Sequence, residues 1–137
     1  MPEINEITGE IVDAAYALHT RIGPGLLESV YEGMLAKILE FRGLQVQRQK
    51  LIAVEFDGIR FEEGFRVDLL VENRVVVELK SVERLARVHS KQVLTYLRLL
   101  DLPVGLLINF GAGSLSDGLQ RILNSRGEAV SPLTPLR

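Results

Sequence analysis

The chain has 137 residues, of which 47% are apolar and 25% charged, and its formal net charge is −2. This length and composition predict one compact domain with a sizeable core and argue against disorder away from the ends. The absence of cysteine excludes disulfides, thiolate metal sites and a thiol nucleophile. The acidic pI of about 5.7 argues against a general nucleic-acid coat, so any contact with nucleic acid must be local or aided by a partner.

Neither a signal peptide nor a membrane-spanning segment is expected. The N-terminal stretch lacks the basic region of a signal peptide, and no apolar run approaches the ~20 residues that cross a bilayer. Together with the lack of cysteine, this predicts a cytoplasmic protein that is not bound to a membrane. We expect one domain over residues 1–125, followed by a polar, proline-containing tail at 126–137 that is loosely held.

The spacing of apolar residues predicts the elements in chain order. Helices are expected over residues 4–21 and 26–41, separated by the breaker Gly23-Pro24-Gly25. The period then becomes that of strands, with Asp57-Gly58 as a hairpin turn. The predicted strands cover 44–46, 51–56, 59–61, 65–71 and 75–80. A helix over 88–100, a strand over 104–110 that is buried on both faces, and a short helix from Ser114 to about Asn124 complete the chain. This order predicts an α/β fold with a central mixed sheet in α/β/α layers.

The segment FRVDLLVENRVVVELKS, residues 65–81, carries the most informative pattern. Glu78 and Lys80 are two apart in a strand, so they share one face. If residues 72–74 form a three-residue hairpin loop, Asp68 lies opposite Glu78, with Cβ atoms ~5 Å apart. A two-residue loop would shift this register and weaken the geometry.

Two carboxylates opposite each other destabilise a hairpin unless something neutralises them, and a divalent cation does so well. Mg²⁺ (or Mn²⁺) takes oxygen ligands, which makes Asp68 and Glu78 candidate metal ligands. Lys80 is then placed to orient or deprotonate an attacking water, or to hold a phosphate. The alternative is a solvated strand face with Asp68 in an ordinary salt bridge, and the spacing alone leaves both open. The hairpin's other face is expected to anchor it in the core through Val67, Leu69, Val75, Val77 and Leu79.

Asp68 followed by Glu78-Leu79-Lys80 resembles the signature of the PD-(D/E)XK nuclease superfamily. The segment Gly25-Leu-Leu-Glu28-Ser-Val-Tyr31 is similar to the motif of the GxxExxY protein family, which is grouped with these nucleases. The resemblance covers about residues 7–110, although Val67 stands where the signature has proline. It implies a restriction-endonuclease-like three-layer core, catalytic roles for Asp68, Glu78 and Lys80, and metal binding by Asp68, Glu78, the Leu79 carbonyl and Glu28.

The resemblance also maps a Gln-x-x-x-Tyr element onto Gln92 and Tyr96, which are four apart on the helix after the acidic hairpin. These two residues either contact substrate or, for Tyr96, pack in the core. Arg87 and Lys91, with Arg84 and Arg98 nearby, either hold a nucleic-acid backbone or line a solvated helix face. His89 and His19 are not expected to be catalytic.

Three residues of the second predicted helix need an interpretation. Glu28 is either a metal ligand or a first-turn acid favoured by the helix dipole. Glu32 is expected at the surface. Tyr31 is expected to be half-buried, with its hydroxyl directed to the site.

The sequence supports two functions of different class. The first is a Mg²⁺-dependent nuclease that hydrolyses phosphodiester bonds of DNA or RNA. The second is a non-catalytic domain that binds nucleic acid or protein and retains the nuclease fold, which the acidic pI favours. A homodimer would enlarge the small surface that one such domain offers to a duplex.

Overall fold

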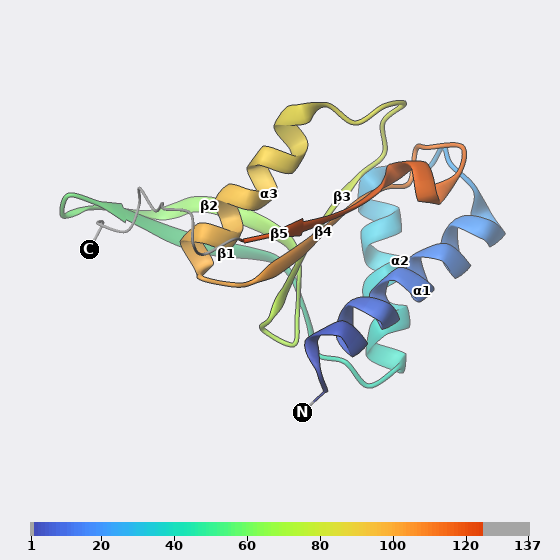
Figure 1. Ribbon diagram of the computed structural model, residues 1–137, viewed down its shortest axis with the longest axis horizontal. Coiled ribbons are helices and arrows are strands. Elements are labelled where there is room, and N and C mark those ends of the chain that lie inside the picture. The colour runs from blue at the N-terminus through green and yellow to red at the C-terminus, as the bar shows by residue number, and fades with distance from the viewer. Residues whose placement is uncertain (1, 125–137) are drawn as a thin grey trace.

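The computed structural model describes residues 2–124 (Figure 1). Its elements are α1 (Ile4–Ile22), α2 (Glu28–Phe41), β1 (Val46–Phe56), β2 (Ile59–Val71), β3 (Val75–Lys80), α3 (Arg87–Leu100), β4 (Val104–Asn109), the 3₁₀ turn η1 (Leu115–Gly118) and β5 (Leu119–Leu123). The strands form one sheet in the order β1-β2-β3-β4-β5. β3 and β4 run parallel, and the other neighbouring pairs run antiparallel. The tail predicted at 126–137 lies outside the described residues.

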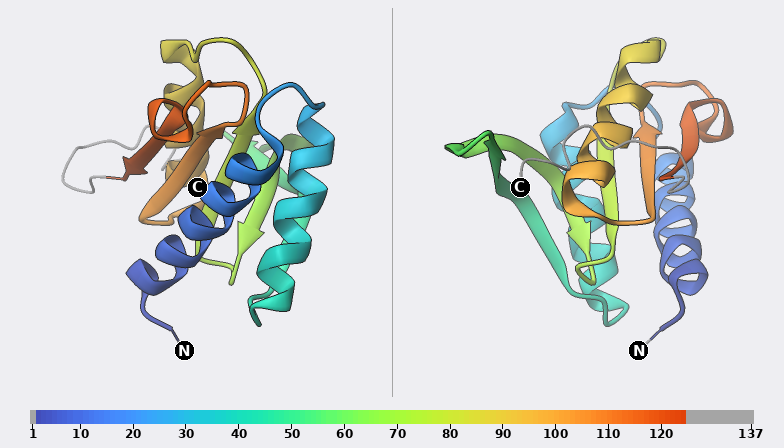
Figure 2. Two further views of the ribbon diagram at one scale, coloured as in Figure 1. Left: turned by 90° about the vertical axis from the view of Figure 1, so that its right-hand side faces the viewer. Right: turned by 60° about the vertical axis from the view of Figure 1, so that its left-hand side comes forward.

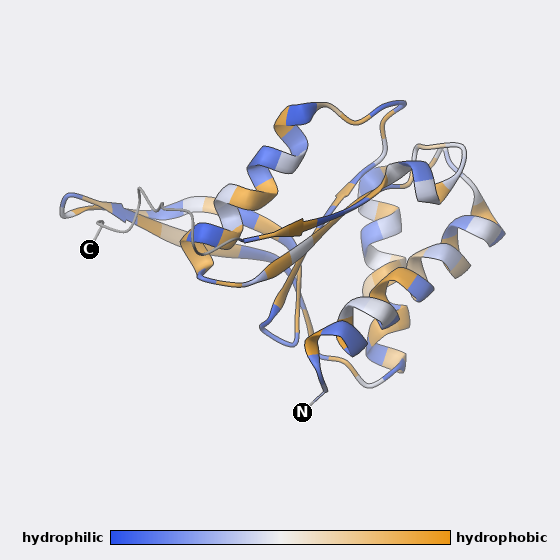
Figure 3. Cartoon of the chain, viewed as in Figure 1, coloured by the Kyte–Doolittle hydropathy of each residue, from blue (hydrophilic) through white to orange (hydrophobic). Residues whose placement is uncertain are grey.

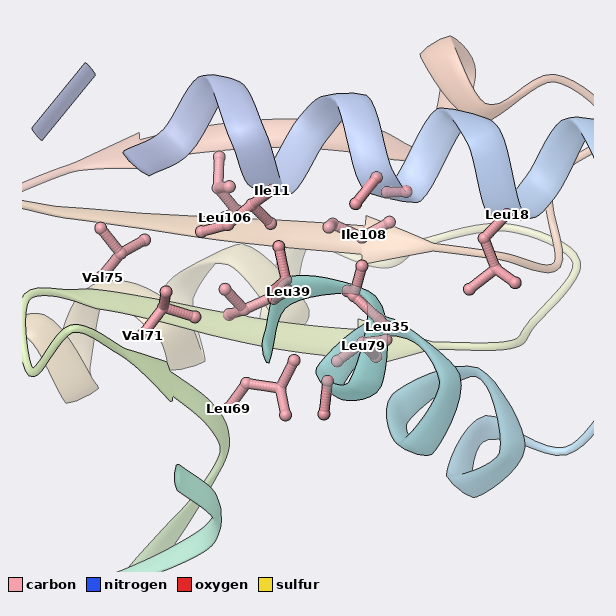
Figure 4. Packing of buried hydrophobic residues seen from close by; sticks show 14 of the residues in the cluster. Ile11, Leu18, Leu35, Leu39, Leu69, Val71, Val75, Leu79, Leu106 and Ile108 are labelled. Carbon is pink, nitrogen blue, oxygen red and sulfur yellow. The ribbon is translucent and has the colours of Figure 1, made fainter. Parts of the chain in front are cut away.

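Helices cover both faces of the sheet, as Figure 2 shows. α1 and α2 pack on one face over a large apolar cluster, part of which is drawn in Figure 4, where Ile11, Leu35, Leu79 and Ile108 interdigitate. α3 packs on the other face over a smaller cluster that includes Val93 and Leu97. The predicted α/β/α fold is therefore confirmed, with the three layers that the nuclease resemblance implies.

The apolar composition of β3 and β4 accounts for their position at the centre of the sheet. All six residues of β4 are buried, and five of the six in β3 are. A strand buried on both faces reads as a continuous apolar run, and here such runs lie between the two helix layers. Figure 3 shows this apolar centre, with polar residues on the outer sides of the helices. None of the helices in the described part of the chain has the length and apolarity needed to cross a bilayer.

The prediction of a helix from Ser114 to about Asn124 is wrong. Residues 115–118 form a single 3₁₀ turn, and the chain then continues as β5, antiparallel to β4. Without β5, the outer backbone groups of β4 would lie unpaired beside a buried strand, and that cost outweighs a weak local helix preference. The separately predicted strands also merge, because β1 and β2 form one long hairpin around Asp57-Gly58 (Figure 1).

The prediction that Val67 shares one face of the hairpin with Leu69 is wrong. Val67 packs with the cluster under α3, whereas Leu69, two residues later, packs with the cluster under α1 and α2. Strand alternation would put both on one face, so the alternation breaks at Asp68 between them. The β1 partner that would stand opposite Asp68 is Gln49, which has a φ of +50°. The irregularity therefore coincides with a candidate site residue.

Candidate metal centre

The turn between β2 and β3 sets the register of the site. Residues 72–74 form the three-residue loop, Val71 pairs with Val75, and Leu69 pairs with Val77. Glu72 and Asn73 both have a φ of +54°, which lets the chain reverse in so few residues. One step beyond the last pair, this register brings Asp68 level with Glu78, as the sequence predicted.

At that step, side chains replace the regular backbone pairing. The backbone N–H of Asp68 donates to Glu78 Oε2 at 2.8 Å. The backbone N–H of Leu79 donates to Asp68 Oδ2 at 2.9 Å. Each carboxylate is therefore held by the backbone of the opposite strand, through hydrogen bonds that are strengthened by the acceptor's charge. The alternative of an ordinary salt bridge at Asp68 is not what the structure forms.

Without a bound cation, the doubly ionised state of Asp68 and Glu78 is disfavoured by burial and by repulsion between the two charges. Glu78 is only 4% exposed, and burial raises its pKa to about 8, with the charge of Asp68 as the next largest cause. The Asp68 N–H and the Lys80 ammonium act in the opposite direction. The donors gathered here are the carboxylate oxygens of Asp68 and Glu78, and hard oxygen donors suit Mg²⁺ or Mn²⁺. Among residues 2–124, no group of three or more acidic or histidine side chains is arranged to hold a metal ion.

Glu28 lies at the start of α2 and within electrostatic range of the pair. Its pKa is raised by partial burial first and then by the charge of Asp68, whereas Lys80 lowers it. Lys80 is the last residue of β3 and is half-buried. The charges of Asp68 and Lys80 therefore act on both Glu78 and Glu28, although Glu28 does not join Asp68 and Glu78 in a ligand cluster.

Tyr31 holds the turn that precedes Glu28. Tyr31 is fully buried, not half-buried, and its ring stacks on Phe110 with centroids 4.5 Å apart. Its hydroxyl donates to the Gly23 carbonyl and accepts the Leu26 N–H, so it fastens the turn rather than reaching the acids. Gly25 within this turn has a φ of +115°, which favours glycine.

Glu32 was predicted at the surface, and that prediction is wrong. It is 5% exposed, and its carboxylate accepts hydrogen bonds from Arg48 Nε at 3.2 Å and Gln49 Nε2 at 2.6 Å. The same Gln49 amide lies 3.2 Å from Asp68 Oδ1. Sequence reasoning missed Gln49 altogether, because a glutamine in a strand gives no local signal of its partners.

The predicted substrate residues all lie on α3, with different surroundings. Tyr96 stacks on Phe65, with centroids 4.3 Å apart, and its pKa is raised by burial and then by the charges of Glu78 and Asp68, so it lies within electrostatic range of the acid pair. Gln92 is half-buried one helical turn earlier, while Arg87 and Lys91 are exposed. His89 Nδ1 accepts the Ala86 N–H at the start of α3, and His19 Nε2 contacts the Ala112 carbonyl.

A second missed residue, Asn109, holds the end of β3 in place. It is 1% exposed, at the end of the apolar β4, and its side chain binds both backbone groups of Val82. The Phe110 N–H also donates to the Lys80 carbonyl at 2.8 Å. A polar residue within an apolar buried strand is a signal that sequence reasoning could have used. Beside it, a groove of about 470 Å³ is lined by residues 24–28, 81–83 and Gly111, so it runs from the β3 end to Glu28.

Comparison with known proteins gives one result. A family model described as the PD-(D/E)XK nuclease superfamily matches residues 5–122, which include every predicted site residue. Searches of curated proteins and of solved structures found no match. Because the matched region covers most of the chain and contains the Asp68–Glu78 pair and Lys80, the chain belongs to the PD-(D/E)XK nuclease superfamily.

Proposed function

We propose that this chain is a divalent-metal-dependent nuclease that hydrolyses phosphodiester bonds of DNA or RNA. The observation that carries the proposal is the acid pair, in which Asp68 and Glu78 are each held by a backbone N–H from the other's strand. Membership of a nuclease superfamily supports the reaction class, although a shared fold alone does not fix the substrate.

The carboxylates of Asp68 and Glu78 and the carbonyl of Leu79 would hold Mg²⁺ or Mn²⁺, with Glu28 contributing directly or through water. Two carboxylates suffice, because Mg²⁺ in phosphate-processing sites usually completes its shell with waters and substrate oxygens. When bound, the ion supplies water activation and stabilises charge on the phosphate. The raised pKa of Glu78 supports a site built for a cation.

The chain's own cation in the site is Lys80. Its ammonium stands two residues beyond Glu78 on the same strand, and its charge acts on both Glu78 and Glu28. We assign it to binding a non-bridging phosphate oxygen or to orienting and deprotonating the attacking water. Its position is supported by the bond from the Phe110 N–H to its carbonyl.

We assign substrate binding to α3. Tyr96 and Gln92 are one turn apart, and Tyr96 lies within electrostatic range of the acid pair, so both are suited to contact the nucleotide next to the bond that is cleaved. Arg87 and Lys91 are exposed near the start of the same helix and are suited to neighbouring phosphates.

Within the superfamily, we infer that the chain is a GxxExxY protein. The support is structural: Tyr31 fastens the turn that contains Gly25 and leads directly into Glu28, so the three motif positions act as one unit. We also propose that the protein acts as a homodimer, because one domain of this size offers a short surface to a duplex.

A second function is favoured by a specific observation. Arg42, Arg48 and Arg60 all form ion pairs with carboxylates of the same chain, so their charge is locally neutralised. The pairing of these three cations, together with the acidic pI, would weaken binding to nucleic acid. The alternative function is therefore a non-catalytic domain that binds nucleic acid or protein.

Cleavage assays distinguish the two functions. Purified protein is incubated with Mg²⁺ or Mn²⁺ and labelled single-stranded DNA, duplex DNA and RNA, each with free and with blocked ends. The nuclease proposal expects cleavage of at least one substrate that Glu78→Ala and Lys80→Ala abolish. Glu63→Ala, which removes an exposed acid on β2, is the matched control and should cleave like wild type. Equal residual cleavage by wild type and Glu78→Ala would contradict the proposal.

A further inference from the structure

The side-chain amide of Gln49, on β1, lies between two carboxylates. Its Nε2 is 2.6 Å from Glu32 Oε1 and 3.2 Å from Asp68 Oδ1. Ionised carboxylates only accept hydrogen bonds, and an amide nitrogen carries two hydrogens, so the group fits with one N–H directed to each acid. Gln49 thereby connects the buried acid of α2 to the candidate metal ligand on β2.

The backbone at Gln49 is shaped for this contact. Its φ of +50° lies in the left-handed region, which is strained for a residue with a side chain. In a regular strand, Arg48 and Gln49 would point to opposite faces, yet both side chains reach Glu32. The β1–β2 pairing joins Arg48 to Leu69 and Lys50 to Val67, and it leaves out Gln49 and Asp68 between them. The irregular backbone therefore turns the Gln49 amide toward the acids.

The Gln49 contact completes the restraint on Asp68. The Leu79 N–H binds Asp68 Oδ2, which fixes one oxygen. The terminal torsion of an aspartate is broad, so one bond leaves the plane of the carboxylate free to turn. The Gln49 amide binds the other oxygen and restricts that rotation.

We propose that Gln49 is a positioning residue that fixes the orientation of the Asp68 carboxylate, and that Glu32 anchors Gln49 in turn. The importance of this for metal binding rests on the proposed function. The positioning itself is a property of the metal-free protein and can be measured without an ion.

Three variants separate positioning from space filling. Gln49→Glu keeps the length and shape of the side chain but replaces its two donor hydrogens by an acceptor, so that three carboxylates meet. Gln49→Gly removes the amide and adopts a φ of +50° without strain, which protects the fold. Gln47→Gly is the matched control, because Gln47 is an exposed glutamine two residues earlier on the same strand.

The decisive readout is the Leu79 amide proton in the metal-free protein, followed by hydrogen exchange in ¹⁵N NMR spectra. Its bond to Asp68 should weaken when the carboxylate is freed, so exchange at Leu79 relative to Val77 should become on the order of tenfold faster in Gln49→Gly and Gln49→Glu. The ratio should not change in Gln47→Gly. An unchanged ratio in both Gln49 variants would overturn the proposal, as would wild-type behaviour of Gln49→Glu, which indicates space filling.

Titration with Mn²⁺ tests the consequence for the metal centre. Loss of a residue that orients a metal ligand typically weakens binding 10–100-fold, so we expect a fall of about that size in both Gln49 variants and none in Gln47→Gly. Equal affinity in wild type and the Gln49 variants would contradict this role. A wild-type protein that binds no Mn²⁺ would refute the proposed metal centre, whereas the Leu79 exchange would still decide whether Gln49 positions Asp68.

Discussion

The side-chain amide of Asn109 forms two hydrogen bonds with the backbone of Val82: Oδ1 accepts the Val82 N–H at 3.0 Å, and Nδ2 donates to the Val82 carbonyl at 2.9 Å. The same Oδ1 accepts the Gly111 N–H at 3.0 Å. The end of β4 is thereby joined to the segment that leaves β3 directly after Lys80. These hydrogen bonds therefore hold the backbone that carries Lys80 at the end of β3.

Replacing Asn109 by alanine should destabilise the protein by about 2–4 kcal/mol, because the part-buried hydrogen bonds to the backbone groups of Val82 and Gly111 are lost. Asn109→Asp should be intermediate, since it keeps the acceptor and loses the donor. The free energy of unfolding in urea measures both. Gln120→Ala, an exposed polar residue on β5, is the control and should change stability by less than about 0.5 kcal/mol.

Gly111 and Gly113 should differ sharply in their tolerance of alanine. A Cβ at Gly111 would lie 2.3 Å from the Val82 carbonyl oxygen, which is backbone and cannot move aside, whereas a Cβ at Gly113 would meet nothing within 4 Å. We expect Gly111→Ala to cost about 1–3 kcal/mol or more, and Gly113→Ala to be close to neutral. Equal melting temperatures for the two variants would contradict the close approach of β3 and β4 ends.

Tyr31→Phe should loosen the turn before Glu28 without disturbing the core. The ring keeps its stack on Phe110, but the Leu26 N–H and the Gly23 carbonyl lose the hydroxyl, at a cost of about 1 kcal/mol. Faster amide exchange at Leu26 would report the change locally. Tyr16→Phe, at an exposed position on α1, should have no effect. An unchanged Leu26 amide in Tyr31→Phe would show that the hydroxyl does not hold the turn.

The metal-free protein should lose stability as the pH rises from about 4.5 to about 8. The folded-state pKa of Glu78 is raised to about 8, above the unfolded value, so its contribution is full below pH 4.5 and is lost as pH approaches 8. The total loss should be on the order of a few kcal/mol. Glu78→Gln, which keeps an acceptor for the Asp68 N–H and never ionises, should flatten this part of the urea-denaturation profile. A wild-type profile that matches the variant would contradict the raised pKa.

Much of this architecture was predictable, because it depends on local patterns. Apolar spacing identified the three helices, Asp57-Gly58 identified the long hairpin, and the loop at 72–74 gave the register that aligns Asp68 with Glu78. Each of these is decided by residues close together in the chain.

The errors share a different origin, which is tertiary context. β5 forms because β4 needs a pairing partner, and Glu32 is buried because Arg48 and Gln49, 16 and 17 residues away, donate hydrogen bonds to its carboxylate. Val67 changes face because the strand is irregular at Asp68. No local spacing rule contains these long-range contacts, so the role of Gln49 became visible only when the fold brought its partners together.

The central claim is that Asp68 and Glu78 form a divalent-metal centre, and calorimetric titration of the metal-free protein with Mn²⁺ tests it most directly. We predict saturable binding to the wild-type chain that Asp68→Ala abolishes and that Glu63→Ala leaves unchanged. Absence of binding to the wild type, or binding that survives Asp68→Ala, would contradict the assignment of this pair as a metal centre.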